Sequence, residues 1–240
     1  MNREKNLEKA LPSWTDYDEI NEIIIVDWSS KKPLKDNSII QELANNSPKI
    51  KIARVNNEPY FSLPKSYNLA ASLISPANKI FLKLDCDFQS ISNEWIKQLK
   101  FKNGELDGYC LRGHEGHEGV EPALSGILLI NKKDFPKYNE NLIGWGHDDF
   151  NLYARITTNR KPFPNIEKYV HHLPHTNEER TENYPIEDKS MTPNELRSKS
   201  HKNNLLLGKK KHWRSRIFRI LKREKQYLEL EFLPSPFMTD

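Results

Sequence analysis

Short apolar runs recur along the chain at the length of buried β-strands. The clearest covers residues 22–27 and is nearly continuous in Ile and Val, as expected for a parallel strand covered on both faces. Comparable runs predict further strands over residues 49–55, 79–84, 105–111 and 123–130, and a short strand that ends within 169–175.

Between these runs, apolar residues recur at three- and four-residue steps, which predicts helices. The predicted helices cover residues 4–11, 33–43, 66–75 and 92–99, the first ended by Pro12 and the last capped by Ser92. Alternating strands and helices indicate a doubly wound α/β sheet, and a chain of 240 residues can bury a sizeable core.

Composition narrows the class of protein. The 24 aromatic residues argue against wholesale disorder, although 29% of residues are charged. The longest apolar runs are too short to cross a bilayer, and the polar N-terminus lacks the pattern of a signal peptide. Two cysteines, Cys86 and Cys110, give no disulfide framework. We therefore expect a cytoplasmic protein.

Charge is unevenly distributed. The chain carries a net charge of +4, but residues 197–225 hold twelve Lys or Arg against one acid, Glu224. The remainder therefore has a net charge of −7. An acidic body with a basic tail indicates that the tail is the part that meets an anionic partner.

Two pairs of carboxylates follow predicted structural boundaries. Asp85 and Asp87 come directly after the strand at 79–84. Asp148 and Asp149 follow a Gly-Trp-Gly turn at the predicted start of a helix, an end that favours negative charge. An acidic helix cap alone would explain the second pair, but the presence of both pairs favours a ligand-binding site.

The order and spacing of the segments around these two acidic pairs resemble those of the nucleotide-sugar glycosyltransferases of the GT-A fold. The match is to family-2-like enzymes with a galactosyltransferase-type (family 7) C-terminal segment. Asp85-Cys86-Asp87 matches their Asp-x-Asp motif, and residues 144–155 match their Gly-Trp-Gly-x-Glu-Asp segment, with Asp148 where Glu is usual.

The resemblance covers residues 1–185 and implies a mixed central sheet flanked by helices. Residues 1–90 would form the nucleotide-binding half and residues 91–185 the acceptor half of a catalytic domain. Residues 186–240 would then be a basic, helical C-terminal extension.

The resemblance also assigns roles to individual residues. Asp149 matches the catalytic base that takes the proton of the acceptor hydroxyl in inverting enzymes. The residues that would bind the acceptor are Asp148, Trp145 and Gly146. Because Asp148 is shorter than the Glu that is usual at this position, it would select an acceptor sugar with a different arrangement of hydroxyl groups. For the nucleotide-sugar donor, the resemblance implies that Arg3 contacts the diphosphate and Asp27 the nucleotide base. Asp85 would contact the ribose or a metal-bound water. The donor sugar would lie against Ser125 and Gly126.

Three histidines within residues 171–175 are unusual, and imidazole is a common ligand of transition metals. The resemblance places a metal-binding histidine here. Alignment makes His172 the first choice and His175 the second, beside Asp87. The implied cofactor is Mn²⁺ or Mg²⁺. Polar histidines in a solvated loop are the alternative.

One feature departs from the resemblance. Similar proteins have a strand directly before an Asn-Arg dipeptide, whereas here Asn2-Arg3 follows the initiator Met. Either the start codon is placed too late or another element fills that position in the sheet, and both alternatives stay open.

The predicted function is an inverting, metal-dependent glycosyltransferase. It would move a hexose or N-acetylhexosamine from a nucleotide sugar, UDP-linked in our expectation, to a glycan or lipid-linked acceptor in surface polysaccharide synthesis. A metal-dependent nuclease or phosphatase is a rival, but a two-metal site would need more carboxylates. A nucleic-acid-binding module is another, but the acidic body and the lack of a known binding signature argue against it, and no nucleic acid is expected.

The basic tail carries an apolar stripe formed by Trp213, Ile217, Phe218, Ile220 and Leu221. This pattern predicts a basic amphipathic helix, which would place residues 209–225 on an anionic membrane at the inner face of the cell membrane. The stripe could equally dock on the catalytic body.

Overall fold

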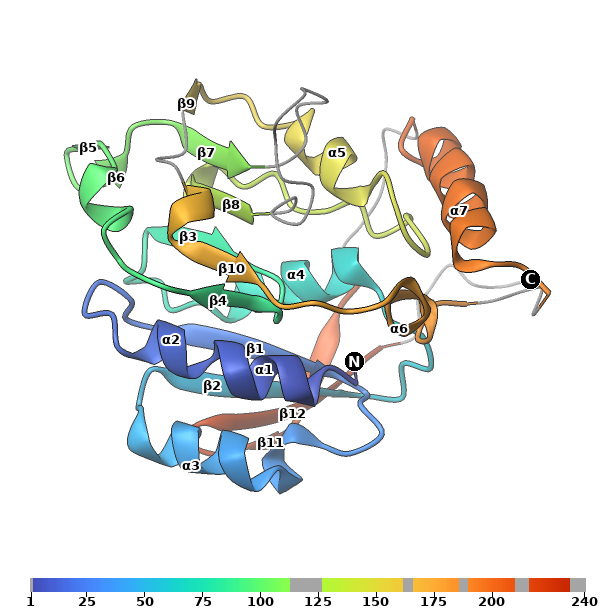
Figure 1. The fold of residues 1–240 in the computed structure, drawn as a ribbon, viewed down its shortest axis with the longest axis horizontal. Coiled ribbons are helices and arrows are strands. Elements are labelled where there is room, and N and C mark those ends of the chain that lie inside the picture. The colour runs from blue at the N-terminus through green and yellow to red at the C-terminus, as the bar shows by residue number, and fades with distance from the viewer. Residues whose placement is uncertain (1, 113–126, 162–165, 186–189, 210–215, 234–240) are drawn as a thin grey trace.

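The computed structural model describes residues 2–112, 127–161, 166–185, 190–209 and 216–233. Figure 1 shows two halves, each built around a four-stranded sheet. None of the described helices combines the length and apolarity that a membrane span requires.

The first sheet has the order β1-β2-β12-β11. Three neighbouring strands run parallel, namely β1 (Ile23–Trp28), β2 (Ile50–Asn56) and β12 (Tyr227–Phe232), and β11 (Phe218–Arg223) is antiparallel at the edge. Helices α1 (Glu4–Ala10) and α3 (Ser38–Asn46) contribute buried side chains to the core of this half. Trp14 of α2 (Pro12–Thr15) belongs instead to a core cluster that includes residues of the other half. The side chain of Asn37 caps α3 by accepting a hydrogen bond from the Ile40 amide.

The second sheet has the order β3-β8-β7-β9. It consists of β3 (Ile80–Lys83), β8 (Ile127–Asn131), β7 (Tyr109–Arg112) and β9 (Arg160–Lys161). Every residue of β8 is buried, which explains its continuous apolar run. Helix α4 (Leu63–Leu73) joins the two halves in sequence, and its Tyr67 packs into the core beneath the second sheet.

Shorter elements complete the fold. β4 (Phe88–Ser90) pairs antiparallel with β10 (Val170–His172), and β5 (Phe101–Lys102) pairs with β6 (Glu105–Leu106). The remaining helices are α5 (Asp148–Tyr153), α6 (Asn177–Thr181), α7 (Pro193–Leu207) and the 3-10 turns Leu34–Asp36, Ile96–Gln98, Lys132–Asp134 and Ile166–Lys168.

Most elements predicted from periodicity are present, including the helix at residues 4–11 and the strands at 22–27, 49–55 and 79–84. The helix predicted over 92–99 is reduced to the 3-10 turn Ile96–Gln98. The helix predicted over 33–43 begins later, at Ser38, after a separate 3-10 turn.

The prediction of a helical C-terminal tail is wrong beyond α7. Phe218–Arg223 is a strand, and it forms an antiparallel hairpin with β12. Tyr227 and Leu230 of β12 are buried against the first sheet, and this tertiary packing outweighs the helical periodicity of residues 217–221. Because β12 pairs with β2, residues 186–240 are not a separate extension but supply two strands to the first sheet.

Candidate active site

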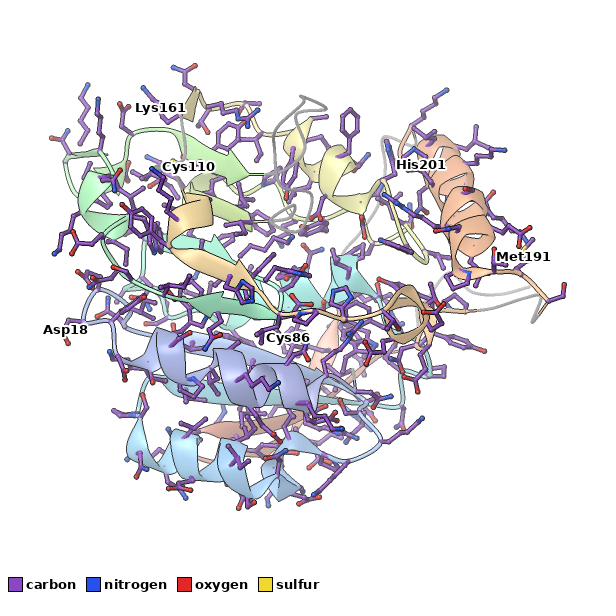
Figure 2. All side chains as sticks on the ribbon, viewed as in Figure 1. Asp18, Cys86, Cys110, Lys161, Met191 and His201 are labelled. Carbon is purple, nitrogen blue, oxygen red and sulfur yellow. The ribbon has the colours of Figure 1, made fainter. Side chains whose placement is uncertain are left out.

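A cavity of about 1390 Å³ opens between the two halves, lined by residues 22–26 at β1 and residues 79–85 at β3. Its lining includes Arg3 and both predicted acidic pairs. In Figure 2, Cys86, which separates Asp85 from Asp87, lies at the level where the two halves meet. The cavity therefore gathers residues that lie far apart in the sequence.

Strand pairing brings the metal-ligand candidates together. β10 pairs with β4 so that His172 lies opposite Phe88, the residue after Asp87, and the Leu173 amide donates to the Asp87 carbonyl at 2.8 Å. The Nε2 atom of His175 lies 3.0 Å from Asp87 Oδ2, and that of His172 lies 3.8 Å from Asp87 Oδ1. One ligand atom from each of Asp87, His172 and His175 lies within 4.8 Å of the others.

The electrostatics of this cluster suit a cation. Burial acts to raise the pKa of Asp87, but the hydrogen bond from His175 and the nearby charges of His172, His175 and Arg3 outweigh it, so the pKa is lowered. The buried Oδ1 of Asp87 has no hydrogen-bond partner among the described residues. A carboxylate and two imidazoles form a donor set that Mn²⁺ accepts, so these residues fit the metal that the resemblance implies.

Asp85 lies beside this cluster and is more deeply enclosed. The hydroxyl of Tyr67, on α4, donates to Asp85 Oδ1 and also contacts the Leu84 carbonyl at 2.8 Å. Burial, together with the charges of Asp87 and Asp149, raises the pKa of Asp85 despite the opposing charge of Lys83. The ionisation of Asp85 therefore depends on the charge of Asp87 in the metal-ligand cluster and on the charge of Asp149 in the second acidic pair.

Asp149 is paired with a cation supplied by the protein. Lys83, the last residue of β3, donates from Nζ to Asp149 Oδ1 at 2.9 Å, and the Tyr138 hydroxyl donates to the same oxygen. The Lys83 side chain is only 1% exposed. Burial acts to lower the pKa of Lys83, but the charges of Asp149 and Asp85 raise it, so the ammonium group stays protonated.

Asp148 is the more buried member of the pair, at 6% exposed. Its Oδ1 accepts from the Asp149 amide at 3.0 Å, and its buried Oδ2 has no hydrogen-bond partner in the part of the chain that the structure describes. Burial and the adjacent Asp149 charge raise the pKa of Asp148 to about 7. Near neutral pH this carboxyl can therefore donate a hydrogen bond as well as accept one.

The Gly-Trp-Gly turn that precedes this pair is held by α7. Asn204, 1% exposed, donates to the Gly146 carbonyl at 2.8 Å and accepts from the Ile143 amide at 3.0 Å. Gly144 has a φ of +78°, and a side chain there would collide with Ser200 on α7. Trp145 lines the cavity, with the Arg197 guanidinium 4.8 Å from its ring centre.

The remaining predicted donor contacts differ in their placement. Arg3 lines the cavity, 3.7 Å from Glu179. Asp27 is 1% exposed, and its carboxylate accepts from Arg54 and from the amides of Ser30 and Leu34, so it braces the turn after β1 and does not line the cavity. Ser125 and Gly126 lie outside the described residues.

Four residues of the site were not predicted: Tyr67, Lys83, Tyr138 and Asn204. Lys83 alone had a local signal, because it interrupts an apolar strand two residues before Asp85 and so shares that residue's face. The other three lie on segments whose contact with the site depends on tertiary packing.

No protein-family model and no curated protein sequence matches the chain. Among solved structures, it is similar to a Drosophila β1,4-galactosyltransferase 7 variant crystallised with manganese, UDP-Gal and xylobiose, at a TM-score of 0.53 and 11% identity, covering 89% of this chain and 95% of that one. The catalytic domain of the same Drosophila enzyme with xylobiose gives a TM-score of 0.52 at 14% identity, covering 90% and 96%. The predicted GT-A fold is confirmed.

Proposed function

We propose that this chain is an inverting, metal-dependent glycosyltransferase that moves a hexose or N-acetylhexosamine from a UDP-linked donor to a glycan or lipid-linked acceptor. The observation that carries the proposal is that one cavity holds both the Asp87-His172-His175 cluster and the Asp148-Asp149 pair. Support comes from a fold shared with an enzyme crystallised with manganese, UDP-Gal and a disaccharide.

The metal cluster would serve the donor. Asp87, His172 and His175 would hold Mn²⁺ or Mg²⁺, which when bound neutralises charge on the leaving diphosphate. Arg3, in the same part of the cavity, would add a cation against the diphosphate. Asp85 would accept hydrogen bonds from the donor ribose or from a metal-bound water.

The second acidic pair would serve the acceptor. Asp149 would take the proton of the acceptor hydroxyl while that oxygen attacks the anomeric carbon and the bond from this carbon to the diphosphate oxygen breaks. Lys83 would keep Asp149 ionised and aimed by its 2.9 Å contact. Asp148 would hydrogen-bond the acceptor sugar, with Trp145 and Gly146 forming the adjoining surface.

A metal-dependent nuclease or phosphatase is less well supported. Within the described residues, the one cluster able to hold a metal contains a single carboxylate and two imidazoles, whereas a two-metal site needs bridging carboxylates around both ions. In the second acidic pair, Asp149 is instead engaged by Lys83 and Tyr138.

Association with an anionic membrane remains part of the proposal, with residues 209–225 as the contact. The described part of this segment exposes Ile217, Ile220 and Leu221 beside Arg219 and Lys222. Because β12 belongs to the sheet, deleting the tail would unfold the protein, so point variants are needed. Ile217→Ser/Leu221→Ser should lose sedimentation with anionic liposomes at low salt, and wild-type protein that ignores such liposomes would refute this part.

A screen of UDP- and GDP-sugars for donor hydrolysis and transfer tests the enzymatic proposal. We expect turnover of at least one UDP-sugar that requires Mn²⁺, with a product of inverted anomeric configuration by NMR. A product that retains the donor configuration would contradict the assignment of Asp149 as base.

A further inference from the structure

One face of α7 forms a wall of the cavity beside the Gly-Trp-Gly turn. Arg197, His201 and Leu205 all line the cavity, and their four-residue spacing places them in one row along the helix. A Cβ on Gly146 would lie 3.4 Å from His201 Nδ1, and Figure 2 shows His201 on α7, at the side that faces α5. This row, which we call the α7 wall, therefore borders the cavity-lining run 145–150 that carries the proposed base.

The position of the α7 wall is set by contacts at both ends of the helix. At the N-terminus, the Thr192 side chain accepts from the Glu195 amide and the Glu195 carboxylate accepts from the Thr192 amide, which forms a capping box. Near the C-terminus, Asn204 bonds to the backbone on either side of the Gly-Trp-Gly turn. The wall is thus held in place against the turn.

Arg197 differs from Lys83 and Arg3, which also line the cavity. Each of these two cations has a nitrogen 3.7 Å or less from a carboxylate oxygen. Within the described part of the chain, Arg197 has no carboxylate partner, and its guanidinium lies over the Trp145 ring, 4.8 Å from the ring centre. A guanidinium over a ring keeps its N–H groups in its own plane, where they match the oxygens of a carboxylate or a phosphate.

Two imidazoles extend this polar surface. His201 lies one helical turn from Arg197, and its ring centre is 5.5 Å from that of His147, which also lines the cavity. Burial and the charge of His201 lower the pKa of His147 below its ordinary value, so near neutral pH His147 is uncharged and offers one N–H donor. The wall therefore presents hydrogen-bond donors beside a fixed positive charge.

The neighbouring acidic pair does not cancel that charge. Asp149 is already paired with Lys83, at 2.9 Å. Burial and the Asp149 charge raise the pKa of Asp148 to about 7, so near neutral pH much of Asp148 is protonated. In the described part of α7, no carboxylate lines the cavity. The balance of charge at the wall is positive.

This surface selects an anionic group rather than a neutral sugar. A neutral sugar would leave the guanidinium without a counter-ion, whereas a carboxylate or a phosphate can accept two parallel N–H bonds from it. The group belongs to the acceptor, because the α7 wall contacts residues 145–147, directly before Asp148 and Asp149. The metal-ligand cluster, which would hold the donor, lies instead on the segments around β4 and β10.

We propose that Arg197 and His201 form a subsite for an anionic group, a carboxylate or a phosphate, on the acceptor. This inference rests on the proposed function and narrows it to acceptors in which a uronic acid or a phosphate lies next to the sugar that receives the transfer. It makes α7, which lies outside the predicted catalytic domain, the element that determines acceptor specificity.

The test measures binding of three probes to the full chain saturated with Mn²⁺ and UDP, which occupy the donor site. The probes are glucuronate, glucose 1-phosphate and methyl glucoside, followed by ligand-observed NMR. At least one of the two anions should bind roughly 10-fold or more tightly than methyl glucoside, as expected for a hydrogen-bonded charge pair. Preference for glucuronate alone indicates an acidic glycan, and preference for glucose 1-phosphate alone indicates a phosphate-linked acceptor. No preference for either anion would overturn the proposal.

Variants locate the preference on the α7 wall. Arg197→Gln should abolish it, and Arg197→Lys should keep part of it, because lysine retains the charge but not the planar fork. His201→Gln should weaken it by less than Arg197→Gln does. Lys202→Gln is the matched control, since it removes a cation from an exposed position of the same helix outside the cavity lining, and it should bind as the wild type does.

Two outcomes would overturn the assignment to this wall. One is an anion preference that survives Arg197→Gln, and the other is an equal loss in Lys202→Gln, which would indicate only the overall charge of the protein. Circular dichroism should show that every variant keeps the wild-type fold. Mn²⁺-dependent UDP binding is measured first and reports on the proposed function alone. If it is absent, the same probes and variants are compared without UDP, so the two failures are distinguishable.

Discussion

Asp87 and Asp149 line the same cavity but have opposite surroundings. Asp87 faces two imidazoles and keeps a buried oxygen without a partner among the described residues, so its site can accept a cation from outside. Asp149 already has a cation, the buried ammonium of Lys83, and a tyrosine hydroxyl on the same oxygen. In the proposed function, this difference in surroundings is why Asp87 would serve as a metal ligand and Asp149 as a base.

Removing the base should have the largest effect on catalysis. Asp149→Asn keeps the size of the side chain but removes the proton acceptor, so transfer should fall by roughly 10²–10⁴-fold while UDP binding is retained. Steady-state transfer assays and calorimetry check the two parts. Asp148→Asn is the matched control, and it should keep substantial activity. Full activity in Asp149→Asn would show that another group takes the proton.

Removing the internal cation should make Asp149 a weaker acid. In Lys83→Met the pKa of Asp149 should rise because a close opposite charge is lost, so the acidic limb of the pH–rate profile should move to higher pH. Breaking this buried pair should also cost about 3–5 kcal/mol of stability.

A double variant separates these two effects. Lys83→Met/Asp149→Asn should recover much of the lost stability but none of the activity, because no uncompensated carboxylate remains. An unshifted pH–rate profile in Lys83→Met would mean that the lysine has only a packing role.

The two histidines should share the metal. His172→Ala and His175→Ala should each weaken Mn²⁺-dependent UDP binding by roughly 10-fold or more. His171→Ala is a matched control from the same strand, because His171 is exposed and lies outside the cluster, and it should bind as the wild type does. If only His175→Ala is damaging, the alignment that favours His172 is wrong by three residues.

The smallest effect concerns stability and pH. The folded pKa of Asp148, about 7, lies above the ordinary value of 3.8, so between these pH values the folded protein binds more protons than the unfolded protein. Its contribution to stability is therefore fully present below about pH 4 and is lost as the pH rises through about 7. Asp148→Asn should raise the Tm at pH 8 by a few degrees and change it little below about pH 4. Equal shifts at both pH values would contradict the raised pKa.

Local patterns predicted much of the framework and of the chemistry. The strand at 22–27 was visible because buried parallel strands are continuously apolar. The acids after 79–84 were visible because two acidic pairs at predicted structural boundaries favour a ligand-binding site. The pairing of His172 opposite Phe88 depends on a register between segments about eighty residues apart, which no local signal encodes.

The tail shows the opposite case. Residues 217–221 satisfy a helical period, but the burial of Tyr227 and Leu230 against the first sheet decides in favour of a strand. Only the three-dimensional contacts separate these alternatives. The same holds for Asn204, whose role follows from the docking of α7 on the Gly-Trp-Gly turn.

Titration of UDP into the protein, with Mn²⁺ and with EDTA, tests the central claim most directly. We expect UDP to bind with Mn²⁺, to bind at least about 10-fold more weakly in EDTA, and to lose its Mn²⁺-dependent binding in Asp87→Ala, whose circular dichroism should match that of the wild type. Equal affinity with and without metal, or undiminished binding by Asp87→Ala, would contradict a metal-dependent nucleotide-sugar site built on Asp87.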